Sequence, residues 1–235
     1  MNNFFKNYWK NTHQKYNKDD YEIQSAQAKE TFDWHQKYVQ KIVPTYFDDY
    51  NPRVLDIGCS SGYLTNILSN FSSEVIGIDY EEGFILDAKS KYSAPKFIVG
   101  DIHNLDEIDG LFDLIVCFGV TQYIDNLGSA LKNLQLKLNN STKSRIIITT
   151  INDNSIFNRN SFWRKLTYLK DSQDINYKTF SKKEFYRLSG ISGLKITKYE
   201  YLYILPKILA PFQLFVKFFF PSSFSHHVFI EMKNA

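Results

Sequence analysis

The chain has 235 residues, of which 43% are hydrophobic, so it is long enough for one sizeable core and too short for two comfortable domains. It carries 28 Lys and Arg residues against 25 Asp and Glu residues, and because the basic residues are scattered, the composition gives no indication of nucleic-acid binding. The two cysteines, Cys59 and Cys117, do not make a disulfide framework and are interpreted as small core residues in a reducing compartment.

The N-terminal stretch is interpreted as a helical extension, residues 1–50, in front of the main domain, residues 51–235. Its first residues contain no apolar run of secretory length, so we expect no signal peptide and a cytoplasmic protein. Apolar side chains recur at helical spacing up to Val43 and predict an amphipathic helix over about 23–43, ending near Pro44. Residues 7–21 are polar and aromatic, with no clear period.

The main domain opens with the stretch from Arg53 to Gly62, which predicts a strand, a tight turn and a helix. A short apolar run breaks at Gly58 into a turn of small residues, and an amphipathic segment follows at 63–71. Small side chains such as Ser60 let the backbone pass close to a ligand, and a helix N-terminus presents N–H groups to it. Alternatively, the stretch is a tight turn that needs glycine only for its backbone geometry and binds no ligand.

Acidic residues follow the next apolar runs at the points where strands are expected to end. The run 74–78 ends in Asp79, 23 residues after Asp56, and the run 96–99 is followed by Asp101. An acidic residue about 20 positions past the first strand of a dinucleotide-binding fold accepts hydrogen bonds from ribose hydroxyls. Because the carboxyl ends of parallel strands line one crevice, the three aspartates are expected to converge on one site, unless each only caps its own turn.

Alternating strands and helices fill the remainder of the chain and indicate a parallel α/β sheet. A fourth apolar run, 112–118, ends at Gly119, and Ser181 with Glu184 forms a capping-box pattern that should start a helix. Helices are expected at 62–71, 82–92, 128–138 and 181–188, and further strands at 145–151, 194–201 and 228–233.

The four runs closely resemble the motifs of the class I S-adenosylmethionine-dependent methyltransferases of small-molecule type: VLDIGCSSG from Val54, VIGID from Val75, GDI from Gly100 and FDLIVCFGV from Phe112. The resemblance implies a Rossmann-like, seven-stranded, mostly parallel sheet with helices on both faces and an antiparallel final strand. It also implies S-adenosyl-L-methionine as the cofactor, with the Gly58–Gly62 loop on its methionine end, Asp79 on the ribose, and Asp101 with Ile102 on the adenine. In many relatives an N-terminal helical segment closes over the cofactor, although packing on the sheet edge would explain residues 1–50 equally well.

One departure from the family pattern is Ser60, which stands where the family most often has its middle glycine. Serine is small enough that we expect cofactor binding to survive. The cofactor-binding residues expected from the resemblance are Asp56, Gly58, Cys59, Ser60, Gly62, Asp79, Tyr80, Asp101, Ile102 and Phe118.

The acceptor is less well defined than the cofactor. Several small-molecule relatives carry histidines after the fourth strand, whereas Gln122 and Tyr123 stand here, so no catalytic base is assigned. No histidine has metal-ligand spacing with a carboxylate partner, so no metal is expected, and the motifs of nucleic-acid base methylation are missing. The leading hypothesis is that the protein transfers a methyl group to an oxygen atom of a small-molecule biosynthetic intermediate. This intermediate would have an apolar or sugar-derived part. The alternatives are a cofactor-binding protein without transfer activity that acts through its aromatic C-terminal region, and, as the weakest, a nicotinamide-dependent oxidoreductase.

Two insertions, 152–180 and 204–224, carry the remaining information about the substrate. The second is intensely apolar but is interrupted by prolines and lysines, and a transmembrane helix needs about 20 apolar residues, so we expect no membrane span. Burial in the domain, an aromatic wall for an apolar acceptor, and peripheral contact with a membrane or a partner remain open for 204–224. The oligomeric state is not predicted.

Overall fold

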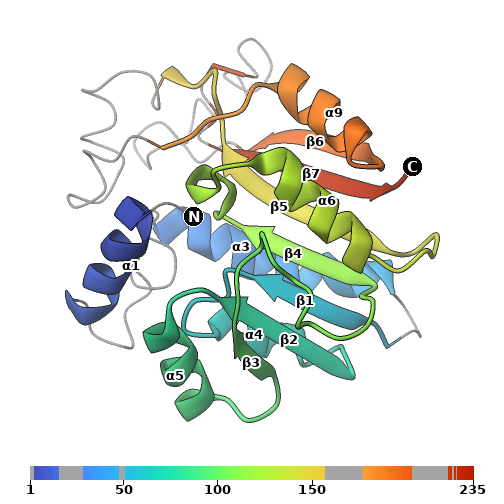
Figure 1. Ribbon diagram of the computed structural model, residues 1–235. Helices are drawn as coiled ribbons and strands as arrows, with labels where there is room; N and C mark the ends of the chain where they lie inside the picture. The colour runs from blue at the N-terminus through green and yellow to red at the C-terminus, as the bar shows by residue number, and fades with distance from the viewer. Residues whose placement is uncertain are drawn as a thin grey trace.

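The computed structural model describes residues 3–15, 29–47, 51–156, 177–202, 222–223, 225 and 227–235. Its centre is one seven-stranded sheet in the order β3-β2-β1-β4-β5-β7-β6 (Figure 1). The strands are β1 (Arg53–Ile57), β2 (Glu74–Asp79), β3 (Lys96–Val99), β4 (Leu114–Phe118), β5 (Arg145–Ile151), β6 (Leu194–Leu202) and β7 (His227–Asn234). The helices are α1 (Asn3–Lys15), α3 (Lys29–Lys41), η1 (Val43–Tyr46), α4 (Tyr63–Leu68), α5 (Glu82–Lys91), η2 (Thr121–Tyr123), α6 (Leu127–Lys137) and α9 (Lys182–Ile191).

The pairing of the strands confirms the expected fold class. β1 pairs in parallel with β2 and β4, and β5 continues the parallel set on the far side of β4. β7 is antiparallel and lies between β5 and β6, so the last strand of the chain enters the interior of the sheet. Burial on both faces explains why the central strands read as continuous apolar runs in the sequence.

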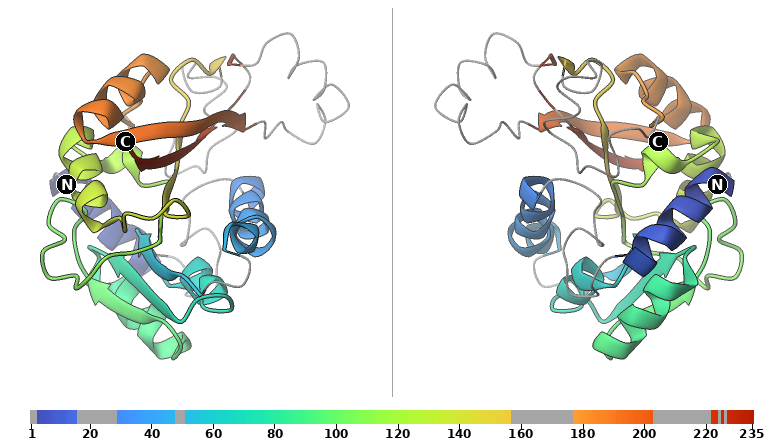
Figure 2. Two further views of the ribbon diagram at one scale, coloured as in Figure 1. Left: turned by 90° about the vertical axis from the view of Figure 1, so that its right-hand side faces the viewer. Right: turned by 90° about the vertical axis from the view of Figure 1, so that its left-hand side faces the viewer.

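Alternate residues of the strands supply two separate cores, one on each face of the sheet. Leu55, Ile115 and Ile148 pack toward the face that holds Leu131 of α6 and Phe185 of α9. Val54, Val116 and Ile147 pack toward the other face, under α3, η1 and α4. Figure 2 shows α6 and α9 on one side of the sheet and α3 and α4 on the other.

The start of α9 has the expected cap. Ser181 Oγ accepts a hydrogen bond from the N–H of Glu184, which confirms the predicted capping box.

The N-terminal region differs from expectation, because the stretch that includes residues 7–15 is part of a helix, α1. Its inner side is formed by Phe5, Trp9 and Thr12, spaced four and three residues apart, and this spacing is helical. Because this side includes a polar residue, Thr12, a pattern based on apolar residues alone does not reveal the helical period. Within α3 the described residues begin at Lys29 and the helix ends at Lys41, two residues before the expected end, after which Val43 and Pro44 open a 3-10 turn.

Parts of three expectations lie outside the described residues: the beginning of the helix predicted over 23–43, most of the insertion 152–180, and nearly all of the insertion 204–224. Cys59 and Cys117 are buried and free, as expected for small core residues. No helix among the described residues is long and apolar enough to cross a membrane.

Candidate functional site

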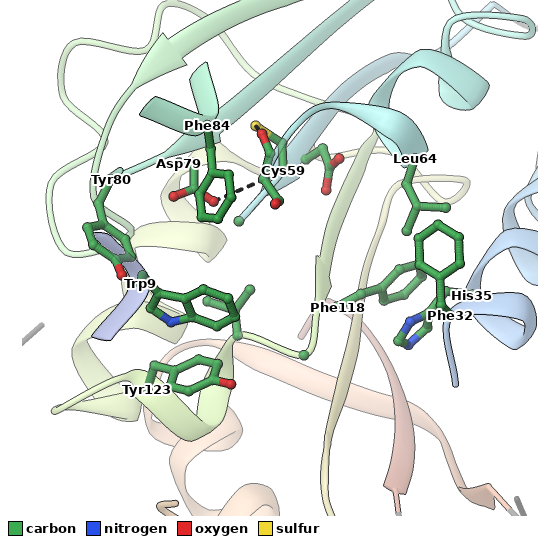
Figure 3. A pocket seen from close by; sticks show the side chains of 15 residues that line it. Trp9, Phe32, His35, Cys59, Leu64, Asp79, Tyr80, Phe84, Phe118 and Tyr123 are labelled. Carbon is green, nitrogen blue, oxygen red and sulfur yellow. Dashed lines mark hydrogen bonds between the residues drawn. The ribbon is translucent and has the colours of Figure 1, made fainter. Parts of the chain in front are cut away.

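A pocket of about 810 Å³, partly open to solvent, lies at the carboxyl ends of β1, β2 and β4. This is the position at which open α/β sheets bind ligands, and the 810 Å³ includes space that is open to solvent. Figure 3 shows two groups of side chains facing each other across it, with the loop around Cys59 between them. The lining residues are Trp9, Phe32, His35, Asp56, Gly58, Cys59, Ser60, Leu64, Asp79, Tyr80, Phe84, Phe118, Gly119, Val120 and Tyr123.

The loop after β1 is held close to the neighbouring strand ends by left-handed backbone conformations. Gly58 has φ +75°, and a Cβ atom on it would lie 2.3 Å from Cγ2 of Val120, so only glycine fits. Gly62 has φ +83°, and its Cβ would lie 2.7 Å from the ring of Phe97. Gly62 is therefore explained by helix–strand packing, while Gly58 is explained by the close approach of two segments that line the pocket.

The N–H groups of this loop differ from the sequence-based expectation, because the fold itself already uses them. Those of Gly58 and Cys59 both donate to the carbonyl of Ile78, at 2.8 and 3.0 Å, and that of Ser60 donates to Asp79 Oδ2 at 3.0 Å. These bonds join the end of β1 to the end of β2. The loop thus offers a ligand its shape and its carbonyl oxygens rather than these three donors.

Asp79 is a buried carboxylate at the carboxyl end of β2. Its Oδ1 accepts from the N–H of Glu81 at 3.0 Å and its Oδ2 from that of Ser60, and a carboxylate can accept further hydrogen bonds. Burial raises the pKa of Asp79 to about 6, against the lowering effect of these backbone bonds. A polar ligand group that donates to Asp79 would therefore relieve an unfavourable burial.

Asp56 lies in the same pocket wall but is bound differently. Its Oδ2 accepts from Thr65 Oγ1 at 2.6 Å, a bond that ties the end of β1 to α4. Burial likewise raises the pKa of Asp56 to about 6. The bond to Thr65 assigns Asp56 to holding the loop and α4 together, and both aspartates keep acceptor capacity for a ligand.

Aromatic rings form the wall of the pocket beside Asp79, and α1 contributes one of them. Trp9 makes edge-to-face contacts with Tyr123 at 5.2 Å and Phe84 at 6.1 Å, measured between ring centroids. Tyr80 donates from its hydroxyl to the carbonyl of Phe5 at 3.2 Å, which fixes α1 over the strand ends. Tyr123, which the sequence left between acceptor contact and packing, is 3% exposed, so it packs and lines the pocket at once.

Across the pocket, α3 supplies Phe32 and His35. The imidazole of His35 is stacked on the ring of Phe118, with centroids 4.5 Å apart and planes 7° from parallel (Figure 3). Its Nε2 lies 2.9 Å from Thr149 Oγ1 of β5. The sequence placed His35 on a helix but gave it no role, because nothing local to the residue indicates which strand ends the helix covers.

The structure brings together most of the expected site residues, but not all of them. Asp101 lies outside this pocket and lines a neighbouring one with Asn7 and Lys10 of α1, and Tyr80 is shared by both. Ile102 is buried in the core, where its carbonyl accepts from Asn133. Trp9, one of four N-terminal aromatic residues that the sequence offered for contacts over the site, lines the pocket. The residues that line it without having been predicted are Phe32, His35, Leu64, Phe84, Gly119 and Val120. Among the described residues, no group of three or more His, Cys, Asp or Glu could hold a metal ion.

A family described as "Methyltransferase domain" matches residues 48–204. A protein of Invertebrate iridescent virus 6 that carries a methyltransferase name, 235L, is 29% identical over 160 residues, covering 65% of this chain and 60% of the viral protein. The mitochondrial ubiquinone biosynthesis O-methyltransferase of Saccharomyces cerevisiae is 28% identical over 124 residues, covering 50% of this chain and 39% of the yeast enzyme. The chain thus spans less than two thirds of the length of either relative.

Among solved structures, the magnesium protoporphyrin IX methyltransferase of Synechocystis PCC 6803 with bound S-adenosylhomocysteine superposes with a TM-score of 0.62. The match covers 100% of this chain and 95% of the other at 15% identity, so it shows a shared fold. A parallel sheet with a buried acidic residue at the end of its second strand and a turn of small residues after its first defines a Rossmann-like, cofactor-binding protein. The chain belongs to the class I S-adenosylmethionine-dependent methyltransferases, which confirms the resemblance of the four motifs and identifies S-adenosyl-L-methionine as the cofactor.

Proposed function

We propose that this protein transfers a methyl group from S-adenosyl-L-methionine to an oxygen atom of a small-molecule acceptor with an apolar part. The observation that carries the proposal is the pocket itself, in which the cofactor motifs and a largely aromatic lining share one space. The O-methyltransferase name of the yeast relative supports oxygen as the acceptor atom. When bound, the cofactor supplies an electrophilic methyl group on a sulfonium.

The residues of the pocket suit this cofactor. Asp79 has acceptor capacity beyond its two backbone bonds and would hold the ribose hydroxyls. The loop from Gly58 to Gly62 would pass along the methionine end, and Tyr80 would contact the adenosine part. Asp101, which lines the neighbouring pocket together with Tyr80, would bind the adenine.

The protein would catalyse the reaction mainly by holding the acceptor in line with the methyl group. Displacement at a methyl carbon needs no covalent residue, and holding two reactants in line with water excluded can supply about 7 to 11 kcal/mol of the barrier. The rings of Trp9, Phe84 and Tyr123 exclude water on one side, and those of Phe32 and Phe118 do so on the other. We assign α1 and α3, within residues 1–50, to the cover of the site.

Isothermal titration tests the proposal. S-adenosylmethionine and S-adenosylhomocysteine should bind at one site per chain, and NADH should give no heat. Radiolabelled cofactor incubated with a metabolite extract should then yield a labelled, organic-extractable product. Binding without any product would favour the inactive cofactor-binding alternative, and a preference for NADH would refute both.

A further inference from the structure

His35 is the only imidazole in the described lining of the pocket, and it stands on the wall opposite Asp79 (Figure 3). The side chain is 3% exposed and its ring is sandwiched against Phe118, so its orientation is fixed. A polar group held rigidly in an apolar wall is well suited to orient whatever occupies the pocket.

The hydrogen bonds around Thr149 decide which nitrogen of His35 carries the proton. Thr149 Oγ1 accepts from the N–H of Gly119 at 3.1 Å and lies 2.9 Å from Nε2 of His35. The threonine hydroxyl has one proton to donate, and among the described residues Nε2 is its one available acceptor. The fully satisfied arrangement therefore has Thr149 donating to Nε2, and this places the imidazole proton on Nδ1.

Nδ1 has no hydrogen-bond partner in the part of the chain that the structure describes, yet it is not among the unpartnered atoms that are completely buried there. Because His35 lines the pocket, a bound ligand is the partner that the described structure leaves open to Nδ1. A neutral imidazole with its proton on Nδ1 acts as a donor at this position and cannot accept a proton from a bound hydroxyl there.

The other ionisable groups of the described lining either have another assigned role or stay protonated. Asp56 is bound to Thr65, Asp79 is assigned to the ribose hydroxyls, and burial raises the pKa values of Cys59, Tyr80 and Tyr123 well above their ordinary range. Burial also lowers the pKa of His35 to about 3, so the ring stays neutral and weakly basic at neutral pH.

We propose that His35 donates a hydrogen bond from Nδ1–H to the methyl acceptor and selects a carboxylate, an acceptor oxygen that is already ionised, on an apolar or aromatic acid. This inference rests on the proposed function and specifies its substrate class. One carboxylate oxygen accepts from Nδ1–H and leaves the other free to attack. The attacking oxygen forms a bond to the methyl carbon as the carbon–sulfur bond breaks and its electron pair passes to sulfur, and no proton is transferred.

A carboxylate acceptor also suits the distribution of charge in the pocket. The described lining contains no Lys or Arg, so the positive charge that attracts the acceptor is that of the bound sulfonium. A hydroxyl acceptor would need a base, and a neutral amine has one lone pair, which the hydrogen bond from Nδ1–H would engage. A carboxylate is the common acceptor group with one oxygen for each task.

The tautomer can be measured without any ligand. Nitrogen-15 spectra of histidine-labelled protein should show a protonated, pyrrole-type Nδ1 and a pyridine-type Nε2 for His35, unchanged between pH 5.5 and 8. Thr149→Val removes the hydroxyl and should shift the proton toward Nε2. A proton on Nε2 in the unmodified protein, or titration within this range, would overturn the proposal.

The selectivity is measured with matched probes: benzoate, 2-naphthoate and octanoate, each against the corresponding alcohol. Protein saturated with sinefungin, whose ammonium replaces the sulfonium, should bind at least one acid tenfold more tightly than its alcohol. Saturation with uncharged S-adenosylhomocysteine should reduce that preference. Equal binding of each acid and its alcohol, including equal absence of binding, would refute the carboxylate assignment.

Two substitutions separate the donor from the ring. His35→Asn keeps an N–H close to the Nδ1 position and should keep most of the preference for the acid, whereas His35→Gln keeps a group near Thr149 and should lose it. Melting temperatures control for folding in both variants. Binding of S-adenosylhomocysteine is measured first. If the protein does not bind it, the proposed function is refuted. If the protein binds it but shows no preference for the acid, only this inference is refuted.

Discussion

Ser60 is the one described non-glycine residue with a left-handed backbone, at φ +49°. Such a conformation costs a side chain with a Cβ roughly 1 kcal/mol or more, although glycine gives back part of the gain through its greater freedom when unfolded. Serine at a position where relatives most often have glycine is therefore tolerated by the fold and not required by the turn.

Replacing Ser60 with glycine should leave stability unchanged or raise it by up to about 1 kcal/mol, with cofactor affinity within about twofold. Gly190→Ala is the matched control, because nothing lies within 4 Å of its added Cβ and the helix should gain about 0.5 to 1 kcal/mol. Urea unfolding measures the stability of each variant, and titration with S-adenosylhomocysteine measures its affinity for the cofactor product. A large loss of affinity in Ser60→Gly would show that the hydroxyl itself contacts the cofactor.

The raised pKa of Asp79 predicts how binding depends on pH. Because the folded value of about 6 exceeds the ordinary value of about 3.9, burial of the ionised form costs stability above pH 6, and the cost shrinks as the pH falls through 6. The ionised form is the better acceptor for two ribose hydroxyls. Affinity for S-adenosylhomocysteine should thus fall about fourfold between pH 7.5 and 5.5.

Titration calorimetry at both pH values measures this dependence. Asp79→Asn should bind at least tenfold more weakly at pH 7.5 and should not show the pH dependence. Unchanged affinity in a folded Asp79→Asn protein would mean that the carboxylate serves only the turn after β2.

At the scale of elements, α1 is the helix whose position bears most directly on the site. His13 Nε2 lies 2.8 Å from Asp87 Oδ2 of α5, and Trp9 reaches into the pocket lining from the same helix. The α1 helix is therefore attached near both ends, by the Tyr80–Phe5 and His13–Asp87 contacts, and covers the site with its middle.

Trp9→Ala should weaken cofactor binding at least fivefold, mainly through faster dissociation, because removal of the ring opens the covered side of the pocket. Asn11→Ala, at an exposed position on the same helix, serves as the control and should bind normally. Stopped-flow measurement of S-adenosylhomocysteine release distinguishes the two. An unchanged release rate in Trp9→Ala would show that α1 packs on the sheet edge without covering the cofactor.

At the scale of the whole molecule, a buried ion pair joins β5 to β7, and Tyr46 of the N-terminal segment contacts both of its side chains. Arg145 of β5 lies 3.3 Å from Glu231 of β7, and its guanidinium stacks 3.8 Å from the centroid of the Tyr46 ring in η1. Tyr46 also donates to Glu231 Oε2 at 3.2 Å. Both charged side chains are at most 10% exposed, so each depends on its partner.

Glu231→Ala should therefore cost about 3 to 5 kcal/mol, because it leaves a buried, unpaired guanidinium. The double substitution Arg145→Met with Glu231→Leu should recover most of the loss. Glu200→Ala, which breaks the exposed pair with Lys198, should cost less than about 1 kcal/mol. Denaturant unfolding checks the series, and a double variant no more stable than Glu231→Ala would contradict the coupling.

The strands and the cofactor loop could be predicted from the sequence because their signals are local. An apolar run that ends in Gly or Asp describes a buried parallel strand and its turn, and β1, β2, β3 and β5 have the expected bounds within one residue. The family motifs are of the same kind, since the residues that follow one strand are adjacent in the chain.

Only the tertiary structure decided which side chains close the pocket. Trp9 and His35 belong to helices that precede the sheet by many residues, and their contacts with Tyr123 and Thr149 cross more than 100 positions of sequence. The same holds for the hydrogen bonds around His35, which involve a hydroxyl of β5 and an N–H after β4. Local periodicity reports which face of an element is buried, but the partner of that face is set by how all the elements pack together.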